Sequence, residues 1–281
     1  MHDFLKRTEK EPPLEVAVKK LAKGRERRKK GIKGRPEWVK TGIPGFDDLI
    51  EHGGIPQGSN ILVSGGPGTG KTIFCLQTLY NAARKGHKCL YITFEESPEK
   101  LKKHMRQFGW KIDSVVNNDL LIVRRMDPFR IARSVEALLA KAAGQLPMGM
   151  EGIPKVIPEG SDPYMIAMDS VSALESAFTG KPESYRIYIE QLFRLFEKTG
   201  AMTFLITETE EVPKRYSRTG VEEFLADGVL VFYYGKVRDI RTRAVEILKL
   251  RGAKHVNKIV PLNITEKGLE VFPGERVFEA E

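Results

Sequence analysis

The stretch that decides the fold runs from Asn60 to Thr72 and reads NILVSGGPGTGKT. Its first five residues are mostly apolar and predict a short buried strand, and a run rich in glycine follows. From Gly65 onward the residues have the spacing G-x-x-x-x-G-K-T. The segment 71–84 then predicts a helix. A strand that enters a glycine-rich turn and leaves it as a helix is typical of a site that binds phosphate groups.

The residue types in this turn fit the chemistry of a nucleotide site. Glycines let the backbone turn tightly, so that several N–H groups point at one phosphate. We expect Lys71 to reach the β and γ phosphates and the Thr72 hydroxyl to bind Mg²⁺. ATP or ADP with Mg²⁺ is therefore the expected cofactor. The residues expected to contact the nucleotide here are Gly66, Gly68, Thr69, Gly70, Lys71 and Thr72.

Strands and helices alternate on both sides of this turn. Apolar runs predict strands at 60–64, 89–94, 120–123, 165–168 and 202–207, and helices at 71–84, from 98, at 128–143 and at 184–198. Four further apolar runs, at 228–234, 244–250, 259–262 and 269–272, are separated only by turns. The predicted fold class is α/β, with a mostly parallel twisted sheet flanked by helices and antiparallel strands at the C-terminal end. Residues 144–163, rich in glycine and proline, predict a long loop.

The net charge of +9 is distributed unevenly along the 281 residues. Residues 1–40 carry 14 basic and 6 acidic side chains, which leaves 32 basic and 31 acidic for the rest. We therefore predict a basic, flexible arm at 1–37 and a globular domain at 38–281.

The two cysteines, Cys75 and Cys89, lie in apolar surroundings and fit neither a disulfide framework nor a zinc site. No secretory or membrane-spanning segment is recognisable, so we expect a cytoplasmic protein with no membrane partner.

Carboxylates follow two of the predicted strands. Asp169 ends the strand at 165–168, where it could hold the hydration shell of Mg²⁺, although an Asp-Ser pair there could also be a turn or a helix cap. Glu95 and Glu96 follow the strand at 89–94, at the edge of the sheet that faces the ligand. Since neighbouring residues point to opposite faces, one of the two is expected to reach the water that attacks the nucleotide. The alternative is a solvated pair that caps the next helix.

Several short motifs occur in a fixed order along the chain. They are TGIPGFDDL at 41–49, GGIP at 53–56, the phosphate loop, FEE at 94–96, FGW at 108–110, MDS at 168–170, GVEEF at 220–224, ADG at 226–228 and KLRGAKH at 249–255. In this order they resemble the KaiC-like branch of the RecA-type P-loop ATPases, over most of the chain. The resemblance implies a RecA-like fold with a single KaiC repeat.

The resemblance also implies a ring, usually a hexamer, with nucleotide bound between subunits. In this family paired glutamates activate water or a hydroxyl, which corresponds to Glu95 and Glu96. A K-x-R segment acts on the neighbour's nucleotide, which corresponds to Lys249 and Arg251, with His255 nearby as a further contact to the nucleotide. From the residues alone, the exposed face of a strand is the favoured interpretation of Lys249 and Arg251, because alternation places both side chains on one side.

The favoured function is a Mg²⁺-dependent, ATP-hydrolysing regulatory ATPase that forms a ring and acts on an unidentified protein partner. One alternative is an ATPase that binds nucleic acid through the arm at 1–37. A second is a self-phosphorylating kinase. Some KaiC repeats carry a Ser-Thr target pair where this chain has Glu223 and Phe224, although Ser217 and Thr219 lie just upstream. A third is a scaffold that holds ATP as a structural ligand.

Overall fold

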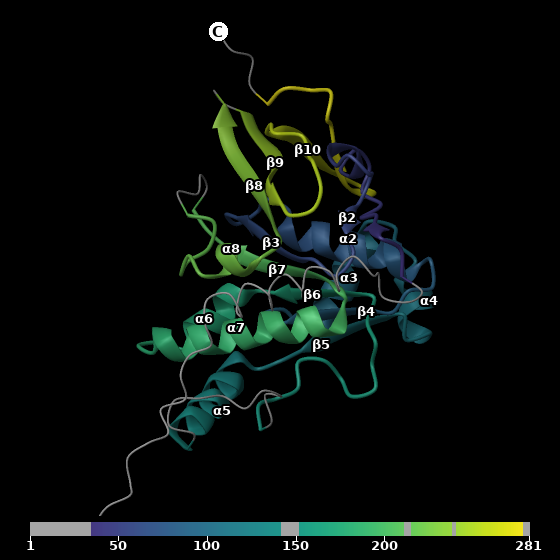
Figure 1. Ribbon diagram of the computed structural model, residues 1–281. Coiled ribbons are helices and arrows are strands. Elements are labelled where there is room, and N and C mark those ends of the chain that lie inside the picture. Colours follow the sequence, from purple (N-terminus) through teal and green to yellow (C-terminus); the bar gives the residue numbers. More distant parts are fainter. Residues whose placement is uncertain (1–34, 142–151, 211–214, 238–239, 278–281) are drawn as a thin grey trace, which may run out of the picture. The chain divides into compact units, whose positions relative to one another are not determined.

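The structure is a computed structural model and describes residues 35–141, 152–210, 215–237 and 240–277 (Figure 1). The chain divides into a unit at 1–37 and a unit at 38–281, and only the second is described below. The strands are β1 Trp38–Val39, β2 Ile55–Pro56, β3 Asn60–Gly65, β4 Cys89–Thr93, β5 Leu121–Arg125, β6 Met165–Asp169, β7 Met202–Glu208, β8 Gly228–Val237, β9 Ile240–Leu250, β10 Val260–Thr265 and β11 Gly268–Val271. The helices are η1 Asp47–Leu49, α2 Lys71–Ala83, α3 Pro98–Gln107, α4 Ile112–Asn117, α5 Pro128–Lys141, α6 Val171–Ala177, α7 Pro182–Thr199 and α8 Glu222–Leu225.

Nine of these strands form one mixed sheet, in the order β11-β10-β9-β8-β3-β7-β6-β4-β5. The strands from β8 to β5 in this order are parallel, whereas β9, β10 and β11 pair antiparallel. The strand that precedes the phosphate loop, β3, therefore lies between β7 and β8, with β6 and β4 next in line. The carboxyl ends of these parallel strands meet at one edge of the sheet, which is where ligands bind in folds of this kind.

Each face of the sheet is covered by its own hydrophobic core. In β3 the side chains of Ile61 and Val63 belong to one core and that of Leu62 to the other. This strand is buried on both faces, as expected for the centre of a parallel sheet. Helices α2, α3 and α4 contribute to the first core, and α5, α6 and α7 to the second, and Figure 1 shows the latter three gathered on one side.

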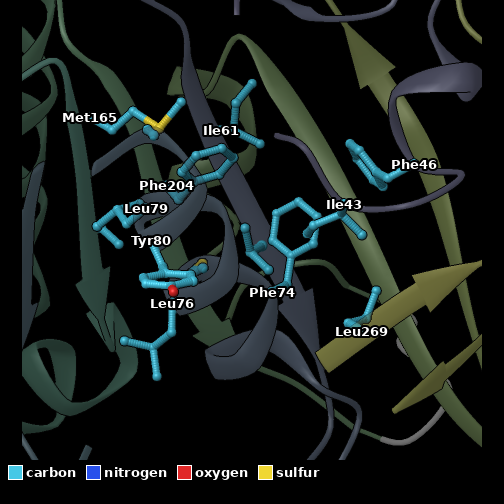
Figure 2. Close-up of a cluster of buried hydrophobic side chains, with 14 of the residues drawn as sticks. Ile43, Phe46, Ile61, Phe74, Leu76, Leu79, Tyr80, Met165, Phe204 and Leu269 are labelled. Carbon is cyan, nitrogen blue, oxygen red and sulfur yellow. The ribbon is translucent and has the colours of Figure 1, made fainter. Parts of the chain in front are cut away.

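The centre of the first core is Phe74 of α2 (Figure 2). Its ring meets those of Phe46, Phe204 and Phe232 edge-on, with centroids 4.9, 5.7 and 5.3 Å away. These rings come from the 41–49 segment, from β7 and from β8. The helix that follows the phosphate loop is therefore anchored to the two strands that flank β3, which fixes the position of the loop.

The predicted fold class is confirmed, including the antiparallel extension at the C-terminal end. The larger predicted elements agree with the structure, with β9 beginning at Ile240 rather than at residue 244. Short elements were missed by the sequence analysis: β1, β2, η1, α4, α6 and α8. Within the predicted loop, residues 152–163 contain no helix or strand, but Ile153 and Val156 are buried in the second core; residues 144–151 lie outside the described residues.

We expect Gly45→Ala to lower the free energy of unfolding by about 3 kcal/mol, because the backbone there is left-handed and crowded. Gly45 has a φ of +74°, and an added Cβ would lie 1.9 Å from the Val271 carbonyl oxygen. Gly53→Ala is the matched control. Gly53 has a φ of +62° with nothing within 4 Å, so only the backbone strain of about 1 kcal/mol is expected. Equal losses for the two variants in urea unfolding would contradict the prediction.

Candidate functional site

The phosphate loop lies at the carboxyl end of β3 and leads directly into α2. Gly68 and Gly70 have φ values of +72° and +105°, a region that glycine adopts without strain. The Lys71 Nζ donates to the Gly66 carbonyl at 2.7 Å, and the Thr69 hydroxyl donates to the same oxygen at 2.8 Å. Lys71 is only 7% exposed, so its ammonium group is held inside the curve of the loop. This is the position from which it could bind phosphate oxygens.

Next to the loop, three oxygen atoms from different elements converge. The Thr72 hydroxyl, on α2, donates to Asp169 Oδ2 at 2.8 Å, and the Tyr91 hydroxyl, on β4, donates to the same oxygen at 2.6 Å. Burial raises the pKa of Asp169, and the two hydrogen bonds oppose that shift. The structure thus brings together Thr72 and Asp169, which lie 97 residues apart in the sequence.

The two consecutive glutamates point in different directions. Glu95 accepts a hydrogen bond from the Ser170 hydroxyl at 3.2 Å, next to the Asp169 group. Burial, and then the negative charge of Glu208, raise the pKa of Glu95 above that of an ordinary glutamate, which suits a proton acceptor. Glu96 instead lies 2.9 Å from Lys100 Nζ on α3. Of the pair, Glu95 is the one placed toward the phosphate loop.

Glu208 is a carboxylate of the site that the sequence analysis missed. It ends β7 and pairs with Gly65 in the register of the sheet, at the start of the phosphate loop. Burial lowers the pKa of Lys71, and the charges of Glu208 and Asp169 oppose that shift. The signal that identified Asp169, a carboxylate at the end of a buried strand, is also present at Glu208 and could have identified it.

Two residues of the C-terminal hairpin also reach the loop. Arg243 Nε donates to the Gly68 carbonyl at 2.8 Å, and its guanidinium lies 4.1 Å from the centroid of the Tyr234 ring. The Tyr234 ring in turn faces Gly68, where an added Cβ would be 3.6 Å away. The long hairpin of β8 and β9 therefore supports the loop from outside. Nothing in the local sequence indicates these contacts, since they join residues far apart in the chain.

Lys249 and Arg251 lie elsewhere, close to the short helix α8. Lys249 Nζ donates to the carbonyls of Glu223 and Ala226 at 3.0 and 2.7 Å. Burial, and then repulsion from Arg251, lower the pKa of Lys249. Arg251 donates to the Phe224 carbonyl at 3.2 Å and, 53% exposed, lies 3.7 Å from Asp227.

This position is at the opposite edge of the sheet from the phosphate loop. Lys249 pairs with Val229 near the start of β8, and the adjoining Gly228 pairs with Ile61 near the start of β3. The loop begins beyond Gly65, four residues and about 13 Å farther along that strand. His255 lies in the turn after β9, in an isolated bridge with Ile50. The structure thus does not bring Lys249, Arg251 or His255 to the loop of their own chain.

The two hydroxyls considered as phosphorylation targets are engaged within their own segment. Ser217 is 1% exposed and donates to Glu223 Oε2 at 3.1 Å. The Thr219 hydroxyl donates to Glu222 Oε2 at 2.6 Å. Ser217 also lines a pocket together with Pro67 of the phosphate loop, so these hydrogen bonds describe how the two hydroxyls are held and do not decide on the self-phosphorylating alternative.

The described residues contain neither a metal-binding cluster of His, Cys, Asp or Glu nor a membrane-spanning helix. Among them, no cluster of three or more His, Cys, Asp or Glu could hold a metal ion. A magnesium ion needs no such cluster, because it binds through one or two protein oxygens together with water and phosphate. No described helix is long and apolar enough to span a membrane.

Comparison with known proteins places the chain among ATPases. The family model described as "ATPase: KaiC" matches residues 39–276. A UPF0273 protein of Thermotoga maritima is 31% identical over 84% of this chain and 96% of its own length. The circadian clock oscillator protein KaiC of Synechococcus elongatus is 34% identical over 84% of this chain, which spans only 44% of KaiC. The crystal structure of a KaiC-like protein from Pyrococcus horikoshii matches with a TM-score of 0.67 and 29% identity, over 84% of this chain and 99% of that one.

Proposed function

Because the chain belongs to the KaiC family of ATPases, as a single KaiC-type repeat, we propose that it is a Mg²⁺-dependent regulatory ATPase whose subunits form a ring and complete one another's sites. The observation that carries this proposal is that two sets of candidate catalytic groups lie far apart within one chain. The phosphate loop, Asp169 and Glu95 meet at one edge of the sheet, while Lys249 and Arg251 lie at the other edge.

The nucleotide and its metal ion would be held by the loop edge of the sheet. Backbone N–H groups of the loop and Lys71 would bind the phosphates, as in other P-loop sites. The oxygens of Thr72 and Asp169 form a donor set suited to Mg²⁺, which prefers hard oxygen ligands. Bound Mg²⁺ would offset the negative charge of the phosphates. The protein's own contribution is to fix these oxygens beside the loop.

Hydrolysis would use Glu95 as the group that orients and deprotonates the attacking water. Replacing Glu95 and Glu96 together with glutamine should abolish phosphate release from ATP, while nucleotide binding is retained, because the loop is unchanged. The measurement is steady-state phosphate release with Mg²⁺ and with EDTA. Undiminished release by the double variant would reject hydrolysis at this site, and bound ATP without release by the wild type would favour the scaffold alternative.

Ring assembly would bring Lys249 and Arg251 of one subunit to the nucleotide of the next. A head-to-tail arrangement joins two different surfaces of the same chain, and such contacts form a ring when the rotation between neighbouring subunits closes. Positive charge placed at the γ phosphate stabilises the transition state of phosphoryl transfer, so catalysis would depend on assembly. A hexamer is the ring size that the family implies, and His255 would lie near the same contact.

The charge asymmetry favours a second candidate, binding of nucleic acid through the segment at 1–37. Contacts between its basic side chains and phosphates would make binding independent of base sequence and sensitive to salt. The test is to titrate DNA and RNA at two salt concentrations with the full chain and with residues 1–37 deleted. No affinity in the full chain would reject this candidate and would leave a protein as the partner on which the ATPase acts.

A further inference from the structure

Tyr91 is a fully buried residue whose hydroxyl group meets the carboxylate of the candidate magnesium site. Its side chain is 0% exposed, and its hydroxyl donates to Asp169 Oδ2 at 2.6 Å. The Thr72 hydroxyl, which belongs to α2, donates to the same oxygen. The carboxylate is therefore held from two sides, by one hydroxyl that belongs to the phosphate-loop motif and by one that does not.

The register of the sheet explains why Tyr91 reaches this position. β4 and β6 run parallel, with Tyr91 opposite Ala167 and Thr93 opposite Asp169. The ring therefore extends along the sheet toward the carboxyl end of β6, on the side of the first core. A phenylalanine ring would fill the same space in that core. What only tyrosine adds is the hydrogen bond to the carboxylate.

A second buried tyrosine shows that a buried tyrosine hydroxyl does not always have a hydrogen-bond partner. Tyr188 of α7 is also 0% exposed, in the second core, and its hydroxyl has no hydrogen-bond partner among the residues that the structure describes. Tyr91 differs because its hydroxyl lies on a carboxylate that a metal ion would use. Hydrogen bonds of this kind orient the ligands of metal sites and contribute to metal affinity.

We propose that Tyr91 is a positioning residue for magnesium, which holds the Asp169 carboxylate in the orientation that serves the metal ion beside Thr72. This inference rests on the proposed function, since it concerns the same nucleotide site. Tyr91 would not touch the nucleotide or the metal ion. It would act through Asp169, so its removal should weaken the response to Mg²⁺ and not the binding of nucleotide as such.

The test is Tyr91→Phe in the full chain, with a fluorescent N-methylanthraniloyl derivative of ATP as the probe. Affinity is measured first in EDTA and then as Mg²⁺ is added. We expect the Mg²⁺ concentration for half-maximal enhancement of binding to rise about tenfold, the lower end of the effect of removing such a hydrogen bond. Affinity in EDTA should change less than about twofold, because the phosphate loop keeps its contacts. Tyr188→Phe, which removes a buried hydroxyl without a partner, should leave both values unchanged.

The outcomes separate this inference from the proposed function. If binding by the wild-type protein does not respond to Mg²⁺, the proposed magnesium site and the role of Tyr91 are both overturned. If the wild type responds and Tyr91→Phe responds identically, only the role of Tyr91 is overturned. A variant that loses affinity equally in EDTA and in Mg²⁺ would show that Tyr91 supports the fold of the loop, which also contradicts the proposal.

Discussion

Replacing Glu95 alone with glutamine is expected to slow ATP hydrolysis by about 100-fold or more, because a positioned general base contributes at least that factor. Glutamine keeps the size of the side chain and can still accept the hydrogen bond from Ser170, but it cannot take a proton from water. Nucleotide affinity should be unchanged. The measurement is single-turnover phosphate release at saturating ATP, together with binding of a labelled nucleotide.

Glu96→Gln is the matched control for this substitution. The Glu96 carboxylate pairs with Lys100 of α3, and the Glu96 side chain is half-buried, at 33% exposed. The lysine of this ion pair is 60% exposed, and loss of such a partly solvated pair costs little, so hydrolysis by Glu96→Gln should stay within about threefold of the wild-type rate. If the two variants lost activity equally, the assignment of the base to Glu95 would be wrong, and both carboxylates would have to act together.

Arg251→Ala is expected to lower hydrolysis about 1000-fold or more, if its guanidinium completes the site of a neighbouring subunit, since an arginine supplied in trans contributes at least that factor to phosphoryl transfer. Within its own chain Arg251 contacts the Phe224 carbonyl and Asp227, at the edge of the sheet remote from the loop. Arg106→Ala, which removes an exposed arginine paired with Asp113, is the control and should retain activity.

A mixing experiment distinguishes action in trans from loss of folding. Subunits with Glu95→Gln and subunits with Arg251→Ala are each inactive in this scheme, but a site formed between one of each can contain both intact groups. Random assembly of equal amounts should restore about one quarter of the wild-type activity, because each site joins two different surfaces. An Arg251→Ala protein that cannot fold would restore nothing. Full activity of Arg251→Ala by itself would refute the role in trans.

The parts of the fold that could be predicted are those encoded in local patterns. The phosphate loop has a fixed spacing, and β3, β4, β6 and β7 are apolar runs of strand length. Asp169 was recognised because it ends such a run. Short elements such as α8 and β1 have too few residues to show a period, and they are held by tertiary contacts instead.

The parts of the candidate site that could not be predicted depend on pairings between distant strands. Arg243 reaches Gly68 only because β8 pairs with β3 and β9 folds back on β8. In the sequence Tyr91 is one more residue of the apolar run that forms β4, and nothing there indicates its contact with the Asp169 carboxylate, 78 residues away. The different directions of Glu95 and Glu96 were anticipated, but the choice between them required the contacts to Ser170 and Lys100.

Glu208 gives the site an electrostatic property with consequences for the order of binding. Together with Asp169 and Glu95 it places three carboxylates around a single lysine, Lys71. These carboxylates would repel a free nucleotide, itself strongly anionic, and would repel a nucleotide that already carries a divalent cation much less; Arg218, 3.7 Å from Glu208, offsets part of their charge. We therefore expect the site to prefer a nucleotide that carries its divalent cation over the free nucleotide.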